Sequence, residues 1–200
     1  MESRSQGAVS AGLTMVLLLA GLWGLEFLDQ LSGGRLDNFG IHARELDGLP
    51  EIFTAPFLHA GWDHLIGNSL PFLVLGFLVL LGGLARWLLS SLITIVSSGL
   101  AAWLLTPAHT IVLGASGLIF GWLTYLLARG LYSRRPGQVV VSLLVLVLYG
   151  SMIWGVLPSA AGISWQAHLG GAVGGLIAAR ALHRRALRRG RYLASSSGLR

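Results

Sequence analysis

Six long apolar stretches constrain what this chain of 200 residues can fold into. They lie at roughly 8–28, 65–85, 87–105, 116–132, 138–156 and 166–183. Most of them approach the ~20 residues that an α-helix needs to cross a hydrocarbon core about 30 Å thick. Charged residues make up 11% of the chain, against about 25% in soluble domains. The sequence therefore predicts an all-α membrane protein built as a bundle of six transmembrane helices.

The first stretch occupies the position of a signal peptide. It is too long for one, has only Arg4 ahead of it, and precedes five further stretches, so we expect it to remain as a helix. The predicted organisation is then a short N-terminal segment (1–7), a six-helix membrane domain (8–185) with a long first loop (29–63), and a basic tail (186–200). We expect this tail to be disordered.

The distribution of arginine predicts the orientation in the membrane. Twelve of the fourteen arginines lie at the start, in the even-numbered connections and at the end of the chain, and only Arg35 and Arg44 lie in the first loop. The positive-inside rule then puts both termini in the cytoplasm. Arginines at the ends of apolar stretches suit anionic lipid headgroups rather than nucleic acid. Because arginine is used to the exclusion of lysine, we expect a high-GC bacterial gene and a bacterial plasma membrane.

Two short motifs place a serine and a histidine beside glycines in the fourth and sixth stretches. The motifs are Gly114-Ala115-Ser116-Gly117 and Ala167-His168, the latter followed by Gly171 and Gly175. His168 and the two later glycines are spaced i, i+3 and i+7, so they share one helix face. Glycine at such spacing lets helix backbones approach closely in lipid. The two faces are predicted to meet and to bring Ser116 within reach of His168.

Depth along the helices supports the same pairing. Ser116 precedes Arg129 by about 20 Å of helix, and His168 precedes Arg180 by about 18 Å. If both arginines lie near the inner interface, the serine and the histidine reach a similar depth on the outer side. The start of the fourth helix must then line a water-filled cavity, because bare helix ends do not face lipid.

A third polar group lies at the start of the second stretch and consists of His59, His64 and Asn68. His64 and Asn68 are spaced i, i+4 and share a helix face. An amide at this place can donate a hydrogen bond to an oxyanion, as side chains of oxyanion holes do.

Each of these side chains also has a structural interpretation. Ser116 can be a helix N-cap, and His168 an interhelical hydrogen-bond donor. His64 with Asn68 can join neighbouring helices. The glycine flanks and the matching depths favour chemistry, since ionisable groups inside a membrane are commonly functional.

Several catalytic chemistries lack their residues. The chain has no cysteine and no His-Glu-x-x-His run. No acid lies within the second to sixth stretches, which excludes an aspartyl pair or a buried Ser-His-Asp triad there. A Ser-His dyad remains, as a variation on the nucleophile-plus-base arrangement. We therefore expect no cofactor and no metal.

Taken together and in this order, the three motifs resemble those of the rhomboid intramembrane serine proteases. The resemblance covers about 49–179 and is carried by His59, His64 and Asn68, by Gly114, Ser116 and Gly117, and by Ala167, His168, Gly171 and Gly175. It implies that Ser116 is the nucleophile and His168 the general base. It also implies an oxyanion hole formed by Asn68, His64 and the Ser116 backbone N–H, with Gly114 shaping the loop.

The resemblance further implies single-pass transmembrane proteins as substrates and an active site that opens to the extracytoplasmic side. The fifth helix and the loop 158–164 would act as a substrate gate. Many relatives have tyrosine one helical turn after the serine, where this chain has Phe120. Phenylalanine keeps the ring that stacks on the histidine and loses the hydroxyl. The alternatives are an inactive rhomboid-like protein that binds membrane clients, and a small-solute channel.

Overall fold

The structure, a computed structural model, describes residues 2–158 and 162–197. Over these residues the chain forms six α-helices and a two-stranded antiparallel ladder. The helices are α1 (Glu2–Ser32), α2 (Trp62–Leu80), α3 (Leu84–Leu105), α4 (Ser116–Ser133), α5 (Pro136–Tyr149) and α6 (Trp165–Ser197). The strands are β1 (Ile41–His42) and β2 (Ile111–Val112).

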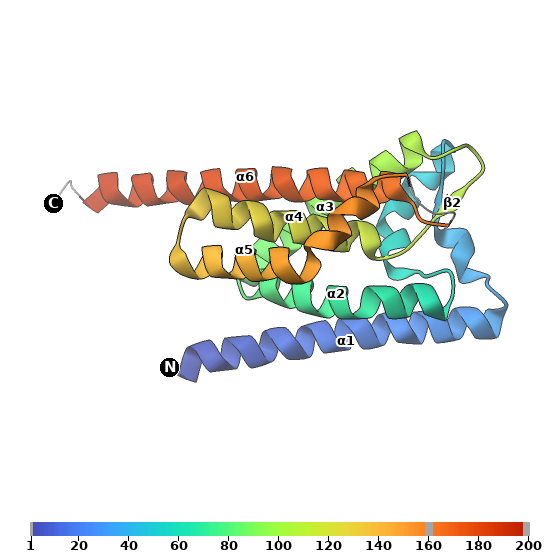
Figure 1. Ribbon diagram of the computed structural model, residues 1–200, viewed down its shortest axis with the longest axis horizontal. Coiled ribbons are helices and arrows are strands. Elements are labelled where there is room, and N and C mark those ends of the chain that lie inside the picture. The colour runs from blue at the N-terminus through green and yellow to red at the C-terminus, as the bar shows by residue number, and fades with distance from the viewer. Residues whose placement is uncertain (1, 159–161, 198–200) are drawn as a thin grey trace.

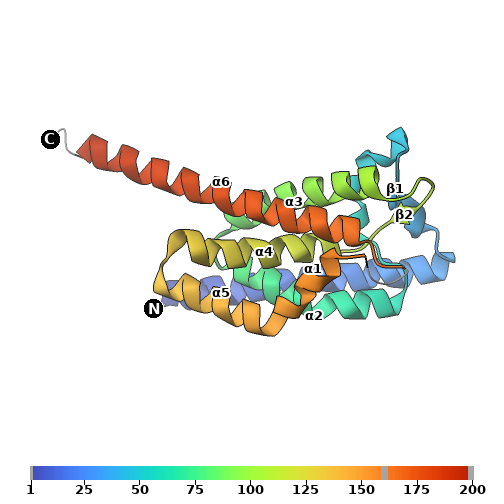
Figure 2. The same ribbon diagram turned by 45° about the horizontal axis from the view of Figure 1, so that its top comes forward.

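Helix α4 lies at the centre of the bundle, where α2, α3, α5 and α6 pack against it. Its side chains explain this position, because Ile119, Trp122 and Leu123 are fully buried. Helix α1 lies at the edge and packs mainly on α2 (Figure 1). The two termini lie at one end of the bundle and the strands at the other, an arrangement that Figure 2 shows from a second side.

Four helical segments of the described chain are long and apolar enough to cross a membrane. They are Ser5–Ser32, Trp62–Leu80, Leu84–Leu105 and Pro136–Val156. Helices α4 and α6 fall outside this group. Both contain many small and polar residues, which suits helices that pack closely on other helices instead of facing lipid.

The helix ends differ from the predicted stretches at several places. The turn at Gly82 and Gly83 separates α2 from α3, because Gly83 has φ +106°, a conformation that breaks a helix and favours glycine. Helix α5 ends at Tyr149 and continues as a 3-10 helix, η5 (Gly150–Val156). Helix α1 takes in most of the predicted N-terminal segment and the first residues of the predicted loop. Its 31 residues span about 46 Å, more than a hydrocarbon core requires.

The predicted disordered tail is wrong over most of its length. Helix α6 continues to Ser197, so residues 186–197 are helical, and 198–200 lie outside the described residues. The physical reason is local: this segment is rich in arginine, leucine and alanine, which have high helix propensity. Polarity alone did not indicate disorder here.

The first loop is ordered by short 3-10 helices and by contacts with the loop that precedes α4. The 3-10 helices are η1 (Leu36–Phe39), η2 (Leu46–Gly48), η3 (Pro50–Phe53) and η4 (Ala55–Phe57). Strand β1 pairs with β2, with Ile41 opposite Val112. Trp103 Nε1 donates a hydrogen bond to the Glu45 carbonyl at 2.7 Å. These contacts fix the loop over one end of the bundle and frame a cavity there.

Candidate active site

A cavity of about 800 Å³ lies at the end of the bundle away from the termini. Its walls come from the first loop, from the β2 loop and from the N-terminal ends of α2, α4 and α6. Ser116, His168, His64 and Asn68 all line it. The structure thus brings together side chains from all three motifs that the sequence singled out.

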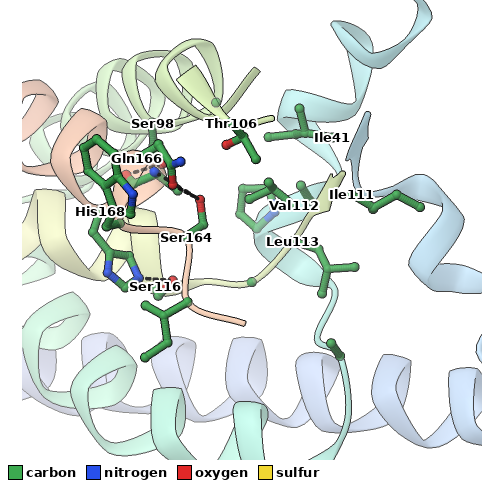
Figure 3. Close-up of a pocket in the computed structure, with 18 of the residues that line it drawn as sticks. Ile41, Ser98, Thr106, Ile111, Val112, Leu113, Ser116, Ser164, Gln166 and His168 are labelled. Carbon is green, nitrogen blue, oxygen red and sulfur yellow. Dashed lines mark hydrogen bonds between the residues drawn. The ribbon is translucent and has the colours of Figure 1, made fainter. Parts of the chain in front are cut away.

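Ser116 and His168 lie within hydrogen-bonding distance of each other. The distance from Ser116 Oγ to His168 Nε2 is 2.8 Å (Figure 3). Ser116 is the first residue of α4, and His168 lies in the first turn of α6. The depth argument from the arginines predicts this meeting. His168 is 8% exposed, so its imidazole is shielded from bulk water except through the cavity.

The second ring nitrogen of His168 sets which nitrogen carries the proton. Nδ1 lies 2.9 Å from the carbonyl oxygen of Gly155 in η5. A carbonyl only accepts hydrogen bonds, so Nδ1–H is the donor. Nε2 is then unprotonated and accepts the hydrogen bond from the Ser116 hydroxyl. This is the tautomer that a general base needs.

The ring of Phe120 holds the imidazole plane. It stacks on His168 with ring centroids 4.2 Å apart and an angle of 9° between the planes. A methyl group on Gly155 would lie 2.7 Å from Cζ of Phe120, so the para position of the ring is already close to η5. The phenylalanine ring thus stacks on the imidazole without a phenolic hydroxyl.

Asn68 and Ser116 each supply a hydrogen-bond donor beside the serine hydroxyl. Asn68 is buried, and its Nδ2 has no hydrogen-bond partner among the described residues. The N–H of Ser116 lies in the first turn of α4, where backbone amides lack an intrahelical acceptor. Free donors of this kind beside a serine hydroxyl can stabilise an oxyanion.

Gly114 allows His64 to approach the loop before Ser116. Its φ is +123°, in the region that favours glycine, and a Cβ at this position would collide with the His64 imidazole. The Gly114 N–H donates to the Ala55 carbonyl at 2.9 Å, which ties this loop to η4. The glycine thus shapes both the loop and the place of His64.

His59 lies below the same loop and is 2% exposed. Its Nε2 accepts a hydrogen bond from the Ala115 N–H at 3.4 Å, and its ring meets that of His64 edge-on. Burial, with a smaller contribution from His64, lowers the pKa of His59 to about 3. The imidazole is therefore neutral at any working pH and supports the loop as a hydrogen-bond acceptor.

The glycines of the sixth helix lie against the fourth helix. A Cβ on Gly171 would collide with the Gly117 carbonyl, and one on Gly175 with the Gly121 carbonyl. Thr124 Oγ1 donates to the Ala172 carbonyl at 2.8 Å in the same interface. Direct contact between the two backbones sets the distance between Ser116 and His168.

Sequence reasoning missed two groups of this site. One is the Gly155 carbonyl, and no side-chain pattern can indicate a backbone acceptor. The other is the pair Ser97 and Ser98 on α3, whose hydroxyls donate to the carbonyls of Gly170 at 2.7 Å and of Ala167 at 2.8 Å. The sequence does contain a signal for this pair, because two adjacent serines inside an apolar stretch need hydrogen-bond partners. Of the predicted gate, residues 159–161 lie outside the described residues.

Comparison with known proteins shows which family this chain belongs to. A family model for the Rhomboid domain matches residues 47–185. Uncharacterized proteins of Mycobacterium tuberculosis and Mycobacterium bovis are each 43% identical over 182 residues, which cover 86% of this chain and 75% of the relative. One of Mycobacterium leprae is 42% identical over 179 residues, with 84% and 70% covered. By this match and its apolar helices, the chain is a membrane protein that belongs to the rhomboid family.

Proposed function

We propose that this protein is an intramembrane serine endopeptidase that cleaves single-pass transmembrane proteins in or near their membrane-spanning helices. The observation that carries the proposal is the hydrogen-bonded chain from Ser116 Oγ through His168 to the Gly155 carbonyl. In a Ser-His-Asp triad the aspartate holds the histidine tautomer. Here a backbone carbonyl takes that role, which removes the need for a buried acid.

The reaction follows from this geometry. Ser116 Oγ attacks the substrate carbonyl carbon while His168 Nε2 takes the hydroxyl proton. The resulting oxyanion accepts hydrogen bonds from Asn68, from His64 and from the Ser116 N–H. His168 then gives its proton to the leaving amine as the C–N bond breaks. A water then attacks the acyl carbon while His168 takes its proton, and His168 returns that proton to Ser116 Oγ as the acyl C–O bond breaks and the acid product leaves.

Water access is the physical requirement of this chemistry, because hydrocarbon excludes water. The cavity around Ser116 lies at the end of the bundle opposite the arginine-rich termini. With both termini in the cytoplasm and all six helices crossing a bacterial plasma membrane, the cavity opens to the extracytoplasmic side. A helical substrate must unwind locally to present a carbonyl there, since its carbonyls otherwise accept intrahelical hydrogen bonds. The reaction as written uses no cofactor or metal.

The test is reaction of the detergent-solubilised protein with a fluorophosphonate, together with cleavage of a model transmembrane substrate. We expect the wild type to be labelled and active. Ser116→Ala and His168→Ala should each lower the cleavage rate by roughly 10⁴-fold or more. Asn68→Ala should lower it by roughly 10²–10³-fold, as expected for loss of one oxyanion donor. Retained cleavage in a purified, folded dyad variant would refute the proposal.

The same experiment separates the alternatives. An inactive client-binding protein would retain a substrate through purification and leave it uncut in the wild type. A small-solute channel would give solute flux in liposomes that survives Ser116→Ala. The filled dyad favours the protease over both.

A further inference from the structure

A second cavity lies at the opposite end of the bundle, beside the turn between α2 and α3. Its volume is about 140 Å³. Its apolar walls are Leu78, Leu81, Leu126 and Val141, and its polar groups are Arg129 and Gln138. This volume corresponds to about four or five water molecules, which is room for one phosphate group. The cavity is separate from the candidate active site and shares none of its residues.

Two guanidinium groups converge on Gly82 at the mouth of this cavity. Arg86 Nη1 donates a hydrogen bond to the Gly82 carbonyl at 3.0 Å. Arg129 reaches the same turn from α4, so that a methyl group on Gly82 would lie 2.6 Å from its Nη1. The cavity therefore concentrates positive charge.

Among the side chains that the structure describes (5–158 and 162–186), no anion pairs with this charge. Arg129 is partly buried, yet the ion pairs found over the described residues join histidines to glutamates in the loops at the other end. In the lining of the same cavity, the buried Oε1 of Gln138 has no hydrogen-bond partner among the described residues. Buried charges and polar atoms are normally paired. A ligand that is both an anion and a hydroxyl donor would satisfy the two groups together.

We propose that this cavity is a binding site for an anionic phospholipid whose headgroup carries a hydroxyl, such as phosphatidylglycerol. The phosphate accepts hydrogen bonds from Arg129 and Arg86, and the headgroup hydroxyl donates to Gln138. Basic pockets between helices at a membrane interface are suited to such headgroups. The acyl chain continues along the exposed apolar face of α5, formed by Val140, Leu144 and Val147.

The experiment measures binding of phosphatidylglycerol to the full-length protein in phosphatidylcholine nanodiscs, by native mass spectrometry over a lipid titration. Arg129→Gln should weaken binding by about 10- to 100-fold, the loss expected for hydrogen bonds to a charged group. The matched control is Arg184→Gln, which removes the same charge. Arg184 is exposed on α6 at the same end of the bundle. We expect the control to bind like the wild type. Equal losses in the two variants would mean diffuse attraction and overturn the site.

Two further arms keep the proposal testable. Gln138→Leu keeps every charge, and should abolish the preference for phosphatidylglycerol over phosphatidylmethanol, a phosphodiester of the same charge that lacks the headgroup hydroxyl. An unchanged preference would contradict the role of Gln138. This variant also tests the site if Arg129→Gln fails to fold.

Competition with inorganic phosphate is the second arm. Inorganic phosphate should not displace the lipid, and displacement would assign the site to free phosphate instead. None of these outcomes depends on proteolytic activity.

Discussion

At the scale of single residues, the site depends on a few positions where one side chain or its absence decides the geometry. Gly155 contributes a carbonyl that orients His168, and Phe120 contributes a ring that keeps the imidazole plane in place. Gly114 contributes the absence of a side chain, which leaves room for His64. Each of these roles requires a specific residue type for a specific physical reason.

Gly114→Ala tests the role of the missing side chain. The variant must hold alanine at a positive φ and move His64, which together cost about 1–3 kcal/mol. We expect a lower melting temperature and a cleavage rate reduced by at least tenfold, roughly the effect of 1.4 kcal/mol on a barrier. Gly137→Ala is the control, since a methyl group there meets open space. Similar rates in both variants would contradict the role given to Gly114.

The His42–Glu51 pair in the first loop predicts a pH dependence of stability. His42 Nδ1–H donates to the Glu51 carboxylate at 2.7 Å, and this hydrogen bond raises the pKa of His42 above its ordinary value. The stability that protonated His42 gains from this pair is complete below pH about 6.5, the ordinary pKa of histidine in the unfolded chain. It is lost as the pH rises through the higher pKa of the folded state. The difference in melting temperature between wild type and His42→Ala should therefore be largest near pH 6 and shrink as the pH rises through the raised folded pKa of His42. A pH-independent difference would show that the pair acts without the charge.

At the scale of elements, the contact between α4 and α6 determines whether the dyad forms. These helices touch through backbone at Gly117 and Gly171, and again at Gly121 and Gly175. Hydrogen bonds from α3 hydroxyls to α6 carbonyls fix the same helix from a second side. The pattern of small residues therefore positions His168 from two directions.

Gly171→Ala should separate α4 from α6. Its Cβ would collide with the Gly117 carbonyl, and such overpacking costs about 1–3 kcal/mol. Misplacement of a catalytic group by about 1 Å can cost 10²-fold in rate, so we expect activity to fall more than stability. Fluorophosphonate labelling and thermal unfolding measure the two effects. The control is Gly24→Ala on α1, where a methyl group meets nothing within 4 Å. It should lower neither the rate of labelling nor the melting temperature.

At the scale of the whole molecule, the two cavities lie at opposite ends of one bundle. The end with the candidate active site carries the acid-rich first loop, and the other carries both termini and most of the arginines. This polarity is what an oriented membrane protein needs. It places the proposed protease chemistry at one water interface and the proposed lipid site at the other.

The absence of cysteine allows a direct test of the orientation. Leu46→Cys introduces a thiol on the first loop, where the leucine is 78% exposed, and Arg184→Cys introduces one near the termini. In intact cells a membrane-impermeant maleimide should label the first variant and reach the second only after lysis, because the positive-inside rule places the termini in the cytoplasm. The reverse pattern would overturn the proposed topology.

The sequence by itself determined the membrane class, the family and the residues that meet in the cavity. Long apolar stretches, arginine placement and three spaced motifs are local properties that a sequence displays directly. It also indicated the meeting of Ser116 and His168, since helix rise converts sequence distance into depth. The prediction of a disordered last segment underestimated its helix propensity, and helix α6 continues to Ser197.

Only the tertiary structure decided the contacts that depend on distant backbone. The Ser98 hydrogen bond to α6 and the convergence of Arg86 and Arg129 on Gly82 join elements far apart in the chain, and the Gly155 carbonyl reaches His168 only because the chain folds back between η5 and α6. A backbone carbonyl has the same chemistry at every residue, so no sequence pattern reveals which one faces a histidine. Packing of the helices selects it, and with it the tautomer on which the proposed chemistry depends.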